Sequence, residues 1–226
     1  MAKEPNEQVY FAYGEKEMEH LKSHDARLGA AIDRIGPISR PVNGDLFAAV
    51  VRNIVAQQIS GVAAQTVLKR LKAASCGITA ANLAAMSESD IQKCGTSMKK
   101  AQYIRDFACK VACGEFDISA MSAMEDEDVI AALSSLRGIG RWTAEMLLLF
   151  TLQRPNVLSY LDLGIHRGMR MVYRHRKITK EMFERYRRRF SPYGSIASLY
   201  FWAVAGGAIP ELTDPALGRN SRRNDK

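Results

Sequence analysis

Cysteine, histidine and long apolar runs are all scarce in this sequence. Four cysteines and four histidines stand among 226 residues, and no two cysteines form a C-x-x-C pair. So few cysteines exclude a disulfide-rich scaffold and favour a reducing compartment. The apolar stretch at residues 146–150 is far too short to span a bilayer, and the N-terminal residues lead into no apolar segment. We therefore expect neither a signal peptide nor a membrane partner.

The overall composition is that of an ordinary globular protein. Hydrophobic residues make up 47% and charged residues 25% of the chain, which excludes disorder as the overall state. A chain of this length buries a sizeable core without disulfides or metals. It fits one domain, or two small lobes that share a core.

Apolar residues recur at helical spacing along most of the chain. The ranges with this pattern are 15–35, 44–59, 61–74, 98–113, 126–135, 141–152, 163–175, 179–189 and 195–206. Residues 141–152 are apolar on nearly all sides, as expected of a central buried helix. No stretch alternates between apolar and polar residues with hairpin turns, so the sequence predicts an all-α fold. Residues 215–226 are polar and predict a disordered tail.

The positive charge is concentrated in one segment. The formal net charge is +8, and residues 167–189 hold ten lysines and arginines against two glutamates. The rest of the chain is therefore electrically balanced. A localised basic face suits the phosphate backbone of a nucleic acid. The alternative is a solvated helix face without a partner.

The sharpest local feature is a Gly-Ile-Gly connection at residues 138–140. It joins a predicted helix that ends near Leu136 to another that begins near Arg141. Two glycines permit positive φ and a close backbone approach. The N–H groups at the start of the new helix, with Arg137 and Arg141 beside them, form a combination that binds phosphate. The alternative is an ordinary turn between helices with a glycine cap.

Asp162 follows this connection by about twenty residues and precedes the next helical pattern. It therefore reads as an N-cap, which by itself needs no further function. A helix N-terminus also favours negative charge, so the carboxylate would stay ionised. A fixed, ionised carboxylate could stabilise a cationic transition state or orient a water molecule.

Four stretches, in order, resemble the helix-hairpin-helix superfamily of DNA glycosylases, and most of all its DNA-3-methyladenine glycosylase II branch. They are residues 54–60, residues 97–104, the block from Gly138 to Asp162, and residues 191–202. The resemblance implies an all-helical fold with two lobes. We expect one lobe at about 1–38 plus 155–214 and the other at about 40–153, with Asp162 and the hairpin at the mouth of one cleft.

The resemblance also assigns roles to single residues. Asp162 matches the catalytic aspartate, and Gln58 matches the wedge residue that fills the gap left by an extruded nucleotide. The hairpin matches a phosphate-binding element that often holds a monovalent cation, here at the backbone of Gly138 and Gly140. We expect DNA contacts from Arg137, Gly138, Ile139, Gly140, Arg141, Lys99, Lys100, Gln58 and Ser60. For the two lysines, the alternative is that they simply face water.

The expected base pocket consists of Trp202, Trp142, Tyr193 and Leu163. Trp202 and Trp142 match pocket positions of the family, and an electron-rich ring stacks well on a cationic flipped base. Plain core packing is the alternative for both tryptophans. At two pocket positions where the family often has tyrosine this chain has Met146 and Leu163, which leaves the range of substrates open.

Two departures from the family's bifunctional members bear on the reaction. Trp142 stands where relatives resembling endonuclease III place a lysine that forms a Schiff base. No cysteine follows Cys113, so the four-cysteine iron–sulfur loop of those relatives is absent from this sequence. We therefore expect hydrolysis without lyase activity, no iron–sulfur cluster, no cofactor and no catalytic metal.

The resulting hypothesis is a monofunctional DNA glycosylase that excises alkylated purines of the 3-methyladenine and 7-methylguanine type in base excision repair. Its expected partner is double-stranded DNA with a damaged base, bound by a monomer. The expected location is the cytoplasm of a bacterium or the nucleus of a eukaryote. The alternatives are a glycosylase for deaminated or oxidised bases and a non-catalytic DNA-binding module, which would not need Asp162 at its spacing.

Overall fold

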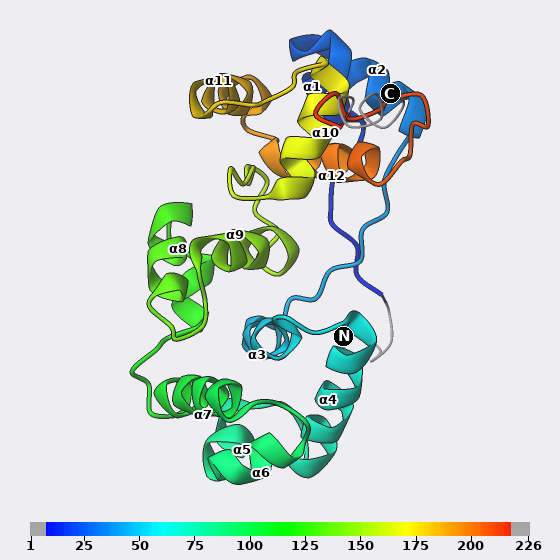
Figure 1. The fold of residues 1–226 in the computed structure, drawn as a ribbon. Helices are drawn as coiled ribbons and strands as arrows, with labels where there is room; N and C mark the ends of the chain where they lie inside the picture. The colour runs from blue at the N-terminus through cyan, green and yellow to red at the C-terminus, as the bar shows by residue number, and fades with distance from the viewer. Residues whose placement is uncertain (1–7, 218–226) are drawn as a thin grey trace, which may run out of the picture. The chain divides into compact units, whose positions relative to one another are not determined.

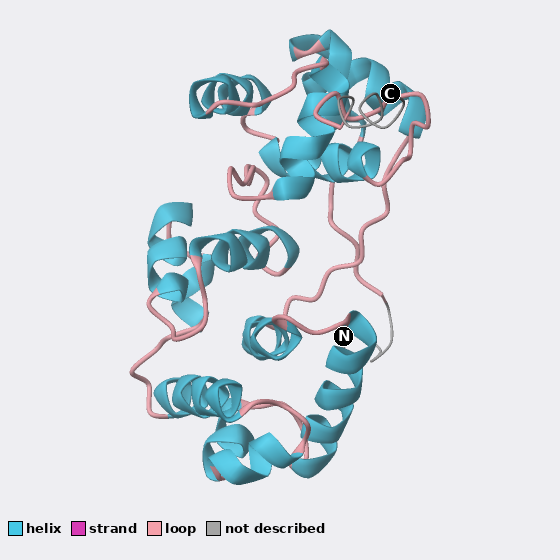
Figure 2. Cartoon of the chain, in the orientation of Figure 1, coloured by secondary structure: helices cyan, strands magenta, loops and turns pink. Residues whose placement is uncertain are grey.

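The computed structural model describes residues 8–217 and is built from helices (Figures 1 and 2). Within this range there is no strand, and the only β-type pairing is an isolated bridge between Tyr10 and Pro41. The prediction of an all-α fold is confirmed. None of the helices in the described range is long and apolar enough to cross a membrane. The predicted disordered tail lies outside the described residues from position 218 onward.

The chain divides into two compact units. Unit 1 comprises Met1–Val42 and Gln153–Lys226, and unit 2 comprises Asn43–Leu152. The sequence places the two divisions at about 38–40 and 153–155, within a few residues of those positions.

Unit 1 joins the two ends of the chain. Its helices are α1 (Glu15–His24), α2 (Ala26–Ile35), α10 (Leu163–Tyr173), α11 (Lys180–Phe190) and α12 (Gly194–Ala205). Helix α10 packs along α12, and the N-terminal helices α1 and α2 pack against α12 as well. Aromatic side chains fill this core, with Phe183, Phe190, Tyr200 and Phe201 fully buried.

The single helix predicted over residues 15–35 is wrong, because Asp25 divides it into α1 and α2. Asp25 has an extended backbone (φ −149°), and its side chain accepts hydrogen bonds from the N–H groups of Arg27 and Leu28. An aspartate that caps a helix in this way offers the backbone an alternative to a continuous helix. The carboxylate is buried and also forms an ion pair with Arg189 of α11 at 2.7 Å.

Some basic side chains of the segment 167–189 have carboxylate partners, whereas others are exposed. Arg170 binds Asp214, with Nε 2.9 Å from Oδ1, and Arg187 binds Glu184 at 2.7 Å. Arg189 is held by Asp25. These three cations are used inside unit 1, whereas residues such as Arg167 and Lys177 are exposed. Fewer than ten positive charges of this segment are therefore available to a polyanion.

Unit 2 contains the remaining helices. They are α3 (Leu46–Ala56), α4 (Gly61–Ala74), α5 (Ala80–Ala85), α6 (Glu88–Lys93), α7 (Met98–Ala112), the 3-10 helix η1 (Ser119–Ser122), α8 (Asp126–Ser134) and α9 (Arg141–Phe150). Helix α9 packs on α3 and α8 and is buried over residues 144–149, so the predicted central helix is confirmed. The apolar pattern of the sequence does not reveal α5, α6 and η1, since one or two turns carry too few apolar residues to show a period.

Candidate active site and nucleic-acid interface

Asp162 is the N-cap of α10, as its position in the sequence predicts. Its Oδ1 accepts a hydrogen bond from the backbone N–H of Ile165 at 2.8 Å and another from the indole Nε1–H of Trp202 at 2.9 Å. Only 6% of the residue is exposed. Two N–H donors on one oxygen fix the plane of the carboxylate, and the helix N-terminus favours its negative charge.

The indole of Trp202 reaches this carboxylate because residue 164 is a glycine. A Cβ at Gly164 would lie 2.8 Å from Cδ1 of Trp202 and 3.1 Å from Oδ1 of Asp162. Any larger residue would push the ring away from the carboxylate. The sequence assigned Trp202 to the base pocket and missed both its hydrogen bond to Asp162 and the role of Gly164.

The other predicted pocket residues belong to both units, and those of unit 1 differ in their relation to Asp162. Leu163 follows it directly and is 84% exposed. Tyr193 is the N-cap of α12 and lies nine residues before Trp202, which corresponds to about 13 Å along a helix. The ring of Tyr193 instead lies edge-on against His20, with centroids 5.0 Å apart. Trp142 belongs to unit 2, where it lies in the first turn of α9 and is 43% exposed.

The Gly-Ile-Gly connection of unit 2 has the form of a tight hairpin, but only one of its two glycines has a positive φ. Gly138 has φ +86°, and a Cβ there would lie 2.5 Å from Cδ2 of Tyr103. Gly140 has φ −96° and open space around it, so a methyl group there would meet no neighbour and force no unfavourable φ. Ile139 is buried and anchors the turn. Gly140 caps α9 without a side-chain hydrogen bond, and the positive end of the helix dipole there favours an anion.

The two arginines beside the hairpin differ. Arg137 is exposed. Arg141 donates hydrogen bonds to Glu127 at 2.8 Å and to Glu145 at 3.0 Å, and the bond to Glu127 raises the pKa of Arg141 above its ordinary value. Because its guanidinium is held by two carboxylates, the structure gives Arg141 a role in fixing α9 and argues against a direct phosphate contact.

The two adjacent lysines of α7 also differ. The ammonium of Lys100 donates to the carbonyl oxygens of Val55 at 2.9 Å and Gln57 at 2.6 Å. Burial lowers its pKa from the ordinary value. Neither predicted alternative, phosphate or water, fits Lys100, because it holds the end of α3. Lys99 is exposed and lies 5.9 Å from the ring centroid of Tyr103.

Gln58, the predicted wedge residue, occupies an exposed loop between α3 and α4. Its φ is +58°, a left-handed conformation that is rare outside glycine and is found at binding sites. This backbone also ends α3 at Ala56, three residues before the predicted end. Ser60 caps α4 by accepting from the N–H of Ala63 at 3.2 Å. The loop is thus fixed at both ends while the Gln58 side chain remains exposed.

Two hairpin carbonyl oxygens, where the sequence predicts a monovalent cation, each accept one hydrogen bond. The carbonyl of Gly138 accepts a hydrogen bond from Nε2 of Gln57 at 2.6 Å, and that of Gly140 accepts from the N–H of Ala144 at 3.0 Å. Because a carbonyl oxygen has two lone pairs, these bonds do not decide whether a cation binds, and the cation site stays a prediction. In the described part of the chain, no group of three or more histidine, cysteine, aspartate or glutamate residues could hold a metal ion.

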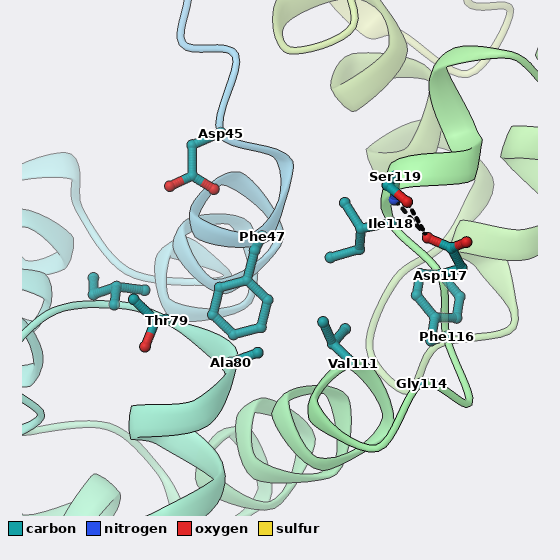
Figure 3. A pocket seen from close by; sticks show the side chains of 11 residues that line it. Asp45, Phe47, Thr79, Ala80, Val111, Gly114, Phe116, Asp117, Ile118 and Ser119 are labelled. Atoms are coloured by element: carbon teal, nitrogen blue, oxygen red, sulfur yellow. Dashed lines mark hydrogen bonds between the residues drawn. The ribbon is translucent and has the colours of Figure 1, made fainter.

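Unit 2 also contains an apolar pocket of about 590 Å³ (Figure 3). Its walls include Phe47, Val111, Phe116 and Ile118, and Asp45 and Asp117 also line it. Among the described residues, none of those assigned to catalysis or DNA binding lines this pocket. The lining residues therefore give this pocket no part in the candidate site.

A tight glycine hairpin before one helix and a buried carboxylate at the start of another define a helix-hairpin-helix protein with a candidate catalytic aspartate. Residues 51–192 match the model of the HhH-GPD superfamily base excision DNA repair protein. This match covers more than half of the sequence, and the chain belongs to that superfamily.

Individual relatives agree with this assignment. A solved structure of a DNA-3-methyladenine glycosidase from Bacillus halodurans is 31% identical, covers 90% of this chain and 95% of its own, and has a TM-score of 0.81. The Schizosaccharomyces pombe 3-methyladenine DNA glycosylase Mag1, solved in complex with abasic DNA, is 26% identical and covers 85% of this chain and 97% of its own, with a TM-score of 0.72. A Saccharomyces cerevisiae DNA-3-methyladenine glycosylase is 28% identical over 198 residues, 71% of this chain and 67% of its own length.

Proposed function

We propose that this protein is a DNA glycosylase that removes alkylated purines from double-stranded DNA by hydrolysis. The observation that carries the proposal is the buried carboxylate of Asp162, held by the N–H of Ile165 and the indole of Trp202. A module that only bound DNA would not need a buried, oriented acid. The substrate class is supported by the names of the relatives, which are 3-methyladenine glycosylases.

In this proposal the duplex is bound through its phosphates by unit 2. The N–H groups at the start of α9 and the exposed Arg137 supply the positive field. The damaged nucleotide rotates out of the stack, and Gln58 fills the space that it leaves. Extrusion costs a few kcal/mol, about the energy of one unstacked step, and costs least at a damaged base pair.

The chemical step breaks the bond between the purine and C1′ of the sugar. The bonding electrons move to the alkylated base, which carries a positive charge and leaves neutral, so the reaction needs little acid catalysis. Positive charge then develops on the sugar, and the carboxylate of Asp162 stabilises it. A water molecule forms the new bond to C1′ and releases its proton to the surrounding solvent. The ring of Trp202, adjacent to this carboxylate, offers a surface on which the base stacks.

The test is release of free base from DNA of defined damage. Duplex methylated with dimethyl sulfate, duplexes that contain uracil or 8-oxoguanine, and undamaged duplex are each incubated with the protein, and free bases are separated by chromatography. We expect 3-methyladenine and 7-methylguanine from the methylated duplex alone. Release of uracil or 8-oxoguanine alone would assign another lesion class, and release from no duplex would leave only a DNA-binding module.

A further inference from the structure

Gln57 has no role in the sequence predictions. In the structure it connects two parts of unit 2, the hairpin and the loop that carries Gln58. Its Nε2 donates to the carbonyl of Gly138 in the hairpin at 2.6 Å, across 81 positions of sequence. Gln57 directly precedes Gln58, the exposed residue with a left-handed backbone. One side chain therefore ties the phosphate-binding hairpin to the loop that carries the wedge.

The first turns of α7 support both ends of this connection. Lys100 donates to the carbonyls of Val55 and Gln57, the oxygens where α3 ends and the loop begins. Tyr103, one turn later, lies directly beneath Gly138, so that even a methyl group on Gly138 would lie 2.5 Å from its ring. Hairpin and loop thus rest on the same helix, and a displacement of either would break contacts to the other.

Because φ at Gln58 is +58°, the loop conformation depends on contacts that hold it in place. Lys100 holds the carbonyl of Gln57, and the hairpin accepts the amide of Gln57. The backbone entering Gln58 is therefore fixed from two sides. Neither contact involves the side chain of Gln58, which is exposed.

We propose that Gln57 and Lys100 are positioning residues that couple the hairpin's grip on the phosphate backbone to insertion of Gln58 into the duplex. This inference rests on the proposed function, since it presumes that the protein extrudes a nucleotide. Binding of phosphate at the hairpin fixes Gly138, Gly138 fixes the amide of Gln57, and the oriented loop presents Gln58 to the stack. Loss of the Gln57 amide leaves the hairpin able to bind phosphate but uncouples the wedge.

The test compares Gln57→Leu with Gln65→Leu, a matched change of an exposed glutamine on α4. Two readouts are used: affinity for undamaged duplex, and fluorescence of 2-aminopurine placed beside an abasic-site analogue, which reports unstacking without any excision. We expect Gln57→Leu to reduce the fluorescence change about tenfold, the scale of one lost hydrogen bond. Its affinity for undamaged duplex should change less than twofold, and Gln65→Leu should match the wild type in both.

A double-mutant cycle with Gln58→Ala separates coupling from a general structural effect. If Gln57 acts through Gln58, the Gln57→Leu change causes no further loss of the fluorescence response once Gln58 is alanine. Losses that multiply in the double variant would overturn the proposal, as would a Gln57→Leu variant with a wild-type response. Lys100→Met, checked for an unchanged melting temperature, should repeat the Gln57→Leu result, and a wild-type response from it would remove Lys100 from the assignment.

The two proposals fail separately. The fluorescence and affinity measurements use an abasic analogue and undamaged DNA, so they do not depend on cleavage of a glycosidic bond. A wild-type protein that releases no base but shows the coupled fluorescence response would contradict only the proposed reaction. A protein that releases alkylated bases but shows no coupling would overturn this inference alone.

Discussion

Replacing Gly138 by alanine perturbs the hairpin at the one position where its geometry demands glycine. The left-handed backbone (φ +86°) costs an alanine about 1–2 kcal/mol. Its methyl would lie 2.5 Å from Cδ2 and 2.9 Å from Cε2 of Tyr103, and overpacking of this kind costs about 1–3 kcal/mol. The combined strain of about 2–5 kcal/mol either lowers stability or displaces the hairpin. We expect affinity for damaged and undamaged duplex to fall alike, by about tenfold or more.

Gly140→Ala is the matched control, since its φ of −96° and open surroundings accept a methyl group. It should lose only about 0.5 kcal/mol of helix capping. The assay is a fluorescence-anisotropy titration of both duplexes at fixed salt, together with urea unfolding of each variant. If Gly138→Ala matched the wild type in both measurements, or if Gly140→Ala were equally damaging, the close packing of Gly138 on Tyr103 would not govern the hairpin.

Three further predictions concern the reaction and the stability of unit 1. Because the chain has Trp142 in place of an amine nucleophile, borohydride added during turnover should trap no covalent protein–DNA adduct, and an adduct on a gel would show lyase chemistry. Trp202→Phe keeps a ring but removes the N–H donor to Asp162, so single-turnover excision should fall about 10–100-fold, the scale of a hydrogen bond to a charged group; an unchanged rate would limit Trp202 to stacking. Asp214→Asn should lower the free energy of unfolding at pH 7 by about 2 kcal/mol, since the hydrogen bond from Arg170 holds the pKa of Asp214 below its ordinary value. That stability is present above the unfolded pKa of about 4 and is lost as pH falls through the lowered folded pKa. The difference between the two proteins should therefore shrink as the pH falls below about 4, and a difference that stays constant there would exclude the ion pair as its cause.

The helices that carry the site could be predicted from the sequence because each shows a long apolar period or a clear cap. The helix that follows Asp162 is an example, since an aspartate directly before a helical pattern is one of the strongest local signals of a helix N-terminus. The Gly-Ile-Gly connection is another, because it lies between two such patterns. By contrast, the break at Asp25 interrupts an apolar period that continues through it, so only the tertiary structure reveals it.

The contacts made by long polar side chains could not be predicted. Lys100 and Arg141 look like phosphate ligands in a basic sequence, but each is held by oxygens of its own unit. Gln57 looks the same as its neighbour Gln58 in sequence, yet only the fold brings its amide to Gly138. The partners of Lys100 and Gln57 lie 43 or more residues away, where local pattern carries no information. Of the partners of Arg141, Glu127 lies 14 residues away and only Glu145, at i+4, is local.

The central claim is that the carboxylate of Asp162 carries out catalysis rather than only capping a helix. The most direct test is single-turnover excision of 7-methylguanine by Asp162→Asn and by Asp45→Asn, which alters the cap of α3 in the same way. Asparagine caps a helix about as well as aspartate, so both variants should fold and bind duplex normally. Loss of a stabilising carboxylate should slow Asp162→Asn by at least about 100-fold, the scale of one electrostatic contact in a transition state, while Asp45→Asn keeps the wild-type rate. An Asp162→Asn variant that excises the base at close to the wild-type rate would contradict the account.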